Sequence, residues 1–286
     1  ETVVLNEETM WSGCEWDVSN PDAQKYLPEI RKKLIEGDNL AAESIMQQHF
    51  TCTGRGSENP RYGCYQTLGK FVIDFSEMMG ADTSYENYSR NLSLDNAIAN
   101  TSFSFNCNGK TAKFNREYFV SIPQNVIVIR LTTENAPLKF DIDFLRDERA
   151  DFSKTDSTMV MQGILDSGDE QKDGVRYLAK AKIVQQSDNQ AIIMIAAATD
   201  YARIIANEEH KDFTEISKSV QRTLDDAARI DYQHLKNNHI HEYQKYYNRV
   251  DVAMGKSGEN GEIQAVDSEA LYLQFGRYLF ISSSVN

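Results

Sequence analysis

Short segments that alternate apolar and polar residues recur between Leu68 and Thr199, and they limit this chain to a mainly β architecture. Phe71, Ile73 and Phe75 occupy every second position of one segment, as side chains on one face of a strand do. Because several such segments follow one another with turn signals between them, we expect a large antiparallel β-sandwich.

One pair of segments carries a strong turn signal. Asn108-Gly109 separates residues 102–106 from residues 112–120, and Asn-Gly is typical of a two-residue hairpin turn. The other expected strands are 2–5, 126–131, 140–144, 159–164, 175–183 and 192–197.

The last third of the chain has an apolar period of about 3.6 residues, which indicates helices. Ile216, Val220 and Leu224 share one face of a first helix, and residues 232–246 form a second, so we expect a helical hairpin. Residues 255–261 are rich in glycine and predict a flexible polar link. The apolar face of a third helix comprises Leu271, Phe275, Tyr278 and Leu279.

A helical insertion is expected near residues 20–50, before most of the strands. Asn20 followed by Pro21 predicts a helix start, because asparagine caps helices and proline suits their first position. Pro28 should interrupt this helix, and Asp38 should cap a second one.

The nonapeptide 5–13, Leu-Asn-Glu-Glu-Thr-Met-Trp-Ser-Gly, combines acids, an amide, hydroxyls and an indole in one short stretch. Amides and carboxylates bind sugar hydroxyls, and an aromatic face packs on the apolar side of a pyranose ring. The alternative is a polar strand end in which Trp11 fills a local core.

Composition excludes several classes of partner. The chain has 43 acidic and 30 basic residues, a net charge of −13, which disfavours binding to nucleic acid or to an anionic membrane. The longest apolar run, 191–198, is too short for a membrane span.

The four cysteines are too few for a disulfide scaffold. Cys52 and Cys64 flank a polar loop. The sequence is equally compatible with a disulfide between these two cysteines and with both thiols being free. No Cys-x-x-Cys occurs and the five histidines lack ligand spacing, so we predict neither a metal site nor a cofactor.

Eight stretches, in order along the chain, carry a family resemblance. They are LNEETMWSG (5–13), YLPEIRKKLIEG (26–37), YQTLGKFVIDF (65–75), REYF (116–119), VIVIRL (126–131), AATDY (197–201), YYNRV (246–250) and LQFGRYLFISSS (273–284). Together they resemble the N-terminal region of glycoside hydrolase family 95, the α-L-fucosidases and their α-L-galactosidase relatives.

The resemblance implies an N-terminal β-sandwich of the super-sandwich type at 1–203 and a helical linker at 204–254. Residues 267–286 would then be the first helix of an (α/α)6 catalytic barrel, with the rest of the barrel outside this chain. In the family the catalytic glutamate, and the asparagine and aspartate that activate water, belong to the barrel. We therefore assign no catalytic residue here and expect the chain alone to be inactive. The resemblance also implies that loops of the sandwich approach the active-site end of the barrel. The candidates for the pocket rim or the barrel interface are then Asn6, Glu8, Thr9, Trp11 and, with weaker support, Gln66 and Arg55.

The function implied is that of an inverting exo-glycosidase which releases terminal α-L-fucose, in particular α-1,2-linked fucose, from oligosaccharides or polysaccharides. Its partners would be that glycan and its own C-terminal catalytic domain, and its location secreted or periplasmic. The alternatives are α-L-galactosidase action, a non-catalytic carbohydrate-binding sandwich, and a purely structural domain.

Overall fold

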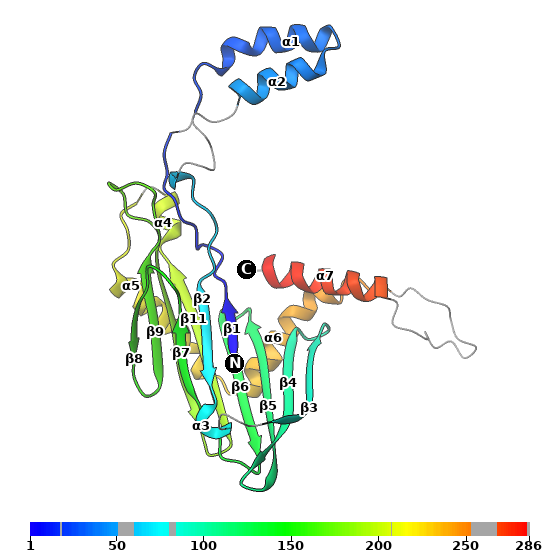
Figure 1. The fold of residues 1–286 in the computed structure, drawn as a ribbon, viewed down its shortest axis with the longest axis vertical. Helices are drawn as coiled ribbons and strands as arrows, with labels where there is room; N and C mark the ends of the chain where they lie inside the picture. The colour runs from blue at the N-terminus through cyan, green and yellow to red at the C-terminus, as the bar shows by residue number, and fades with distance from the viewer. Residues whose placement is uncertain (18, 51–59, 80–83, 207, 253–267, 285–286) are drawn as a thin grey trace, which may run out of the picture.

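Two antiparallel β-sheets of unequal size face each other in the computed structural model, which describes residues 1–17, 19–50, 60–79, 84–206, 208–252 and 268–284 (Figure 1). The smaller sheet has the order β1-β2-β7, with β1 at Thr2–Leu5, β2 at Gly69–Asp74 and β7 at Asp141–Leu145. The larger sheet has the order β3-β4-β5-β6-β11-β10-β9-β8. Its strands are β3 (Tyr85–Ser93), β4 (Ile98–Cys107), β5 (Lys110–Ser121), β6 (Val126–Glu134), β8 (Asp151–Lys154), β9 (Thr158–Ile164), β10 (Arg176–Gln186) and β11 (Gln190–Thr199). The predicted antiparallel sandwich is confirmed.

The main core lies between the two sheets. Phe71 and Ile73 of β2 are completely buried, as their alternation predicts, and Phe144 of the paired strand β7 packs against Phe71. Each such side chain stabilises the fold by about 1.5–3 kcal/mol through burial. The Asn108-Gly109 turn joins β4 and β5 as expected, with both residues at positive φ.

A second core covers the outer face of the larger sheet. Helix α5 (Phe213–Ala228) lies on β10 and β11, and α6 (Tyr232–Tyr247) lies on β5. The buried residues of these helices are Ile216, Val220, Leu224, Ala227, Leu235, His239, Tyr243 and Tyr247. The expected helical hairpin is therefore wrong in its packing, because each helix buries its apolar face against the sheet rather than against the other helix.

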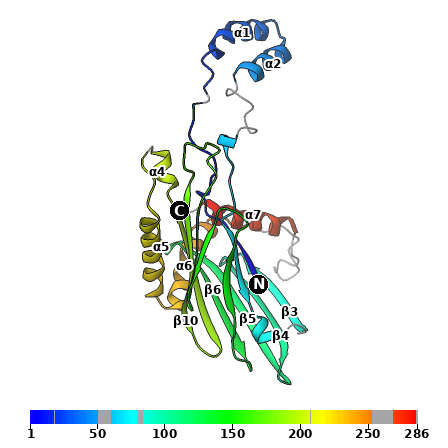
Figure 2. The same ribbon diagram turned by 60° about the vertical axis from the view of Figure 1, so that its left-hand side comes forward.

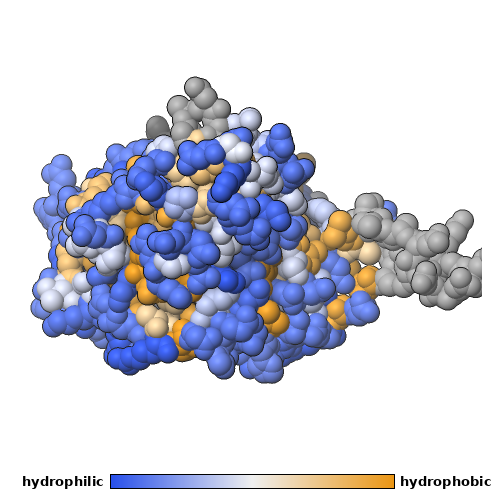
Figure 3. Space-filling model, turned by 90° about the horizontal axis from the view of Figure 1, so that it is seen from below, coloured by the Kyte–Doolittle hydropathy of each residue, from blue (hydrophilic) through white to orange (hydrophobic). Residues whose placement is uncertain are grey.

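Helix α7 (Ser268–Ser284) packs on α6 through Tyr278 and Ile281, which meet Tyr243 and Tyr247. The other three residues of the predicted apolar face are exposed to solvent: Leu271, Phe275 and Leu279 are between 40% and 50% exposed. Figure 3 shows apolar side chains gathered in this part of the surface. The expected apolar face is thus divided, with Tyr278 turned inward. The predicted polar link at 255–261 lies outside the described residues.

The helical insertion extends away from the end of the sandwich (Figures 1 and 2). A 3-10 turn at Ala23–Tyr26 precedes α1 (Leu27–Ile35), and α2 (Asn39–His49) follows. The turn begins three residues later than the expected helix start at Asn20, with Asp22 at the cap position. The Asn20 side chain accepts from the Asp22 amide at 3.2 Å, as a cap does, and also donates to the His49 carbonyl. Pro28 lies in the first turn of α1 and so begins that helix rather than interrupting it.

Asp38 caps α2 as predicted, since its carboxylate accepts a hydrogen bond from the Ala41 amide at 3.2 Å. The other short helices among the described residues are a 3-10 turn at Pro60–Tyr62, α3 at Ser76–Met79 and α4 at Tyr201–Ile205. The boundaries of the sandwich, linker and barrel helix at 203, 254 and 267 stay predictions.

Candidate functional site

The nonapeptide leaves β1 and runs beside the segment that enters β2. The Gln66 amide donates to the Met10 carbonyl at 2.8 Å, and Trp11 forms an antiparallel bridge with Tyr65. Met10 is completely buried whereas Trp11 is 43% exposed. The core residue of this loop is therefore Met10, and the alternative in which Trp11 fills a local core is wrong.

Trp11 and Tyr65 form an exposed aromatic pair. Their rings meet edge to face with centroids 5.5 Å apart. The Trp11 indole N–H donates to the Glu8 carbonyl at 3.1 Å, and the Tyr65 hydroxyl donates to the Glu7 carbonyl at the same distance. The indole N–H and the phenol hydroxyl thus both donate to backbone carbonyls of the nonapeptide. These hydrogen bonds fix the two rings and leave their apolar surface exposed to solvent.

A chain of hydrogen bonds joins this loop to the end of β11. The Tyr201 amide donates to Thr199 Oγ1 at 3.2 Å, and Thr199 Oγ1 lies 2.5 Å from Thr9 Oγ1. Thr9 Oγ1 also lies 2.7 Å from a carboxylate oxygen of Glu7. Because a carboxylate only accepts, Thr9 donates to Glu7 and Thr199 donates to Thr9.

Glu7 is the acceptor at the end of this chain, and sequence reasoning did not select it. Burial raises the pKa of Glu7, whereas hydrogen bonds from Thr9 lower it. Its structural importance depends on Thr199, which is distant in sequence, so no local pattern could have identified it.

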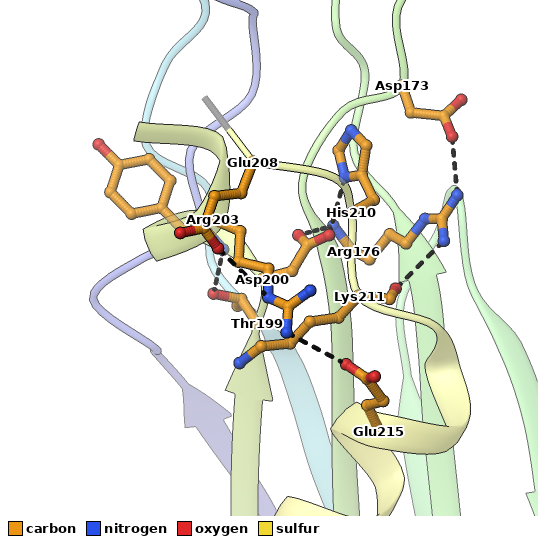
Figure 4. Close-up of polar contacts among 10 residues, drawn as sticks. Asp173, Arg176, Thr199, Asp200, Arg203, Glu208, His210, Lys211 and Glu215 are labelled. Carbon is orange, nitrogen blue, oxygen red and sulfur yellow. Dashed lines mark hydrogen bonds and ion pairs between the residues drawn. The ribbon is translucent and has the colours of Figure 1, made fainter. Parts of the chain in front are cut away.

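Directly after Thr199, the side chain of Asp200 is completely buried (Figure 4). Its carboxylate accepts from the Arg176 amide at 2.8 Å and lies 2.7 Å from His210 Nδ1. Arg176 in turn donates to the Lys211 carbonyl and pairs with Asp173. These contacts fasten β10, β11 and the segment before α5 to one another.

Arg203 of α4 lies 3.9 Å from Glu208 and 3.5 Å from Glu215 of α5. These ion pairs are partly exposed, so each contributes little to stability. The stronger link between β10, β11 and the segment before α5 is therefore the buried Asp200 carboxylate.

The Gln66 side chain helps to fix the segment that enters β2. Its side-chain oxygen accepts from the Arg146 guanidinium at 2.7 Å, and Arg146 also donates to the Thr67 and Leu68 carbonyls. The structure thus brings Thr9, Trp11 and Gln66 together at one end of the sandwich. Asn6 and Glu8 are exposed on the same loop, and Arg55 lies outside the described residues.

Comparison with known proteins identifies the domain. Residues 1–210 match the family model described as glycosyl hydrolase family 65, N-terminal domain. This chain belongs to that family. Residues 231–286 match the glycosyl hydrolase family 95 catalytic domain, which confirms the resemblance to family 95.

Two curated relatives of this chain are fucosidases by name. Alpha-L-fucosidase 2 of Arabidopsis thaliana is 24% identical, and probable alpha-fucosidase A of Aspergillus niger is 26% identical, each over 99% of the chain. The chain spans 38% of the length of both relatives. A solved structure, a putative kojibiose phosphorylase from the human microbiome, aligns with a TM-score of 0.51 over 74% of this chain and 30% of its own. At 10% identity it shows the fold alone.

In the part of the chain that the structure describes, no group of three His, Cys, Asp or Glu residues could hold a metal ion. Cys14, Cys64 and Cys107 have free thiols, and Cys52 lies outside the described residues. Among the described helices, none has the length and apolar character needed to cross a membrane.

Proposed function

We propose that this chain is the N-terminal part of an inverting exo-glycosidase that hydrolyses terminal α-L-fucosyl residues of glycans. α-1,2-Linked fucose is the substrate to test first. The observation that carries the proposal is the match of residues 231–286, which include α6 and α7, to the family 95 catalytic domain. A free-standing sugar-binding sandwich would have no use for that segment.

Inverting hydrolysis needs an acid for the leaving oxygen and a base that activates water on the opposite face of the sugar. We propose that both belong to the catalytic domain that follows α7. The sandwich then supplies a fixed surface, on which the exposed Trp11–Tyr65 pair and the polar residues of the nonapeptide contact either the sugar or the mouth of the barrel. The apolar side chains exposed on α7 support this assignment, because a catalytic domain would cover them.

The test is fucose release from 2′-fucosyllactose, measured for the 286-residue chain and for a longer protein that includes the complete catalytic domain. We expect turnover by the longer protein only. Robust turnover by the 286-residue chain would contradict the assignment of catalysis to the barrel. A longer protein that cleaves the α-L-galactoside and leaves the fucoside intact would contradict the fucosyl specificity.

We further propose that the protein acts outside the cytoplasm, in the periplasm or as a secreted enzyme, because fucosylated glycans are found there. Fractionation of producing cells, with fucosidase activity as the readout, tests this location.

A further inference from the structure

A shallow groove of about 340 Å³ lies on the outer face of the larger sheet. Its walls are formed by β4, β5 and β6, with Asn87 of β3 at one side. Its floor is the backbone of Phe103, Phe114 and Thr133, whose side chains point the other way, between the sheets. Helix α6 covers β5 only as far as Glu117, which pairs with Lys236 at 2.6 Å. The groove is the part of the sheet just beyond that helix.

The walls form two rows across the strands. Ser102, Asn115 and Thr132 are paired in register and make an uncharged row. In the second row Lys113 lies 3.4 Å from Glu134, so the two charges cancel. Within the described residues, the side chains of Ser102, Asn115 and Thr132 donate and accept no hydrogen bond. The groove thus offers hydroxyl and amide groups that the protein does not use.

The inner end of the groove meets a cluster with unsatisfied polar atoms. Glu117 and Arg130 are the next outward residues on β5 and β6, and the Arg130 guanidinium lies over the Tyr232 ring at 4.8 Å. Glu117 Oε1, Arg130 Nε and the Tyr232 hydroxyl are buried without a partner among the described residues. Buried polar atoms in this state cost free energy, although their residues are neighbours of the groove and not part of its lining.

We propose that this groove is a second, non-catalytic binding site for a neutral saccharide. A sugar unit presents donors and acceptors together, which matches the serine, threonine and asparagine side chains of the walls. An anionic ligand is disfavoured, because Lys113 is neutralised by Glu134 and the chain carries a net charge of −13. An apolar ligand is disfavoured because the walls are polar.

The groove is distinct from the nonapeptide end of the sandwich. Thr132 pairs with Gln190 at the start of β11, whereas the nonapeptide bonds to Thr199 at the end of that strand. This length of strand separates the two by about 30 Å. The groove proposal therefore does not rest on the proposed fucosidase activity, and each can fail alone. Without an aromatic platform in the groove, we expect a dissociation constant on the order of a millimolar.

The experiment is a titration of the isotope-labelled 286-residue chain, followed by amide chemical shifts in NMR. The probes are 2′-fucosyllactose, which is neutral, and 3′-sialyllactose, which adds an anionic sugar to the same lactose. We expect saturable shifts at residues 102–104, 113–115 and 132–134 with the neutral sugar, and at least fivefold weaker binding of the anionic one.

Thr132→Val is the informative variant, because it removes a wall hydroxyl and keeps a β-branched side chain. Thr111→Val is its matched control, on the outer face of β5 but outside the groove. We expect at least fivefold weaker binding for Thr132→Val and unchanged binding for Thr111→Val. Shifts absent from the groove, equal binding by both variants, or equal binding of both sugars would overturn the proposal. Shifts confined to the Trp11 end would overturn it while supporting a role for the nonapeptide.

Discussion

Met10 and Trp11 are neighbours in sequence with different environments, since Met10 is fully buried and Trp11 is 43% exposed. Met10→Ala should lower the free energy of unfolding by about 2–5 kcal/mol, because it leaves a cavity. Trp11→Ala should cost only about 1 kcal/mol, mostly the lost ring contact with Tyr65. Urea unfolding of the two variants measures both values. Equal losses would contradict the division of roles.

Asp200→Asn tests the buried carboxylate beneath the nonapeptide. The variant keeps the side-chain size but removes the charge, and its amide cannot accept from both the Arg176 amide and His210. We expect a loss of about 1–3 kcal/mol in unfolding free energy, read from thermal unfolding. Asp173→Asn is the control, because Asp173 is half exposed in its pair with Arg176 and should cost less than about 1 kcal/mol. Similar losses in both would show that burial of Asp200 has no special effect.

At the scale of elements, alternation predicted most strands because one face of each is buried in the inter-sheet core. The two strands that were not predicted, β3 and β8, lie at the edges of the larger sheet. Every residue of β8 is exposed, as are most of β3, so neither carries the apolar alternation of a half-buried strand. Their pairing partners, and not their own side chains, make them strands.

Apart from Gln66, the candidate site was predicted only where its residues adjoin in sequence. Thr9 and Trp11 share one loop, and their polar and aromatic mixture marked it. The bond from Thr9 to Thr199 and the burial of Asp200 arise from sheet pairing over long sequence distances. The site residue Glu7 and the support from His210 therefore required the structure.

Tyr177 on β10 gives a pH dependence with a definite sign. Burial raises the pKa of Tyr177 to about 12, compared with about 10 in an unfolded chain. Its contribution to stability is complete below pH 10 and is lost between about pH 10 and 12, because only the unfolded state ionises there. The loss is roughly 2–3 kcal/mol. The unfolding free energies of the wild type and of Tyr177→Phe should converge between about pH 10 and 12. A constant difference between them over that range would contradict the raised pKa of Tyr177.

Helix α7 should be held at one end only in this chain. Arg277 donates to the carbonyls of Val250 and Tyr247, and Ile281 is buried, whereas Leu271 and Tyr272 are exposed. Hydrogen exchange should therefore be fast for residues 268–275 and slower for 277–284. In a longer protein with the catalytic domain, the whole helix should be protected. Equal protection of 268–275 in both proteins would mean that the sandwich alone stabilises it.

At the scale of the whole molecule, the nonapeptide and the groove lie toward opposite ends of the larger sheet and are stabilised by different contacts. The nonapeptide end is stabilised by buried hydrogen bonds and carries the exposed aromatic pair. The saccharide groove lies toward the opposite end of the larger sheet and has an uncharged polar lining. The proposed catalytic domain follows α7, so only the nonapeptide end is expected to affect catalysis.

The last prediction joins the sandwich to catalysis. In the longer protein, Trp11→Ala should lower kcat/KM for 2′-fucosyllactose by about 5- to 150-fold, equivalent to roughly 1–3 kcal/mol of transition-state stabilisation. The physical reason is that the exposed indole face is free to pack on the sugar or on a loop of the barrel mouth. Thr111→Val, which lies outside both the nonapeptide and the groove, is the control and should leave kcat/KM unchanged. A large fall in melting temperature for Trp11→Ala with normal kinetics in the folded fraction would end the assignment of Trp11 to the pocket rim. Glu8→Gln separates charge from shape on the same loop, and unchanged kinetics there would leave Glu8 outside the sugar contact.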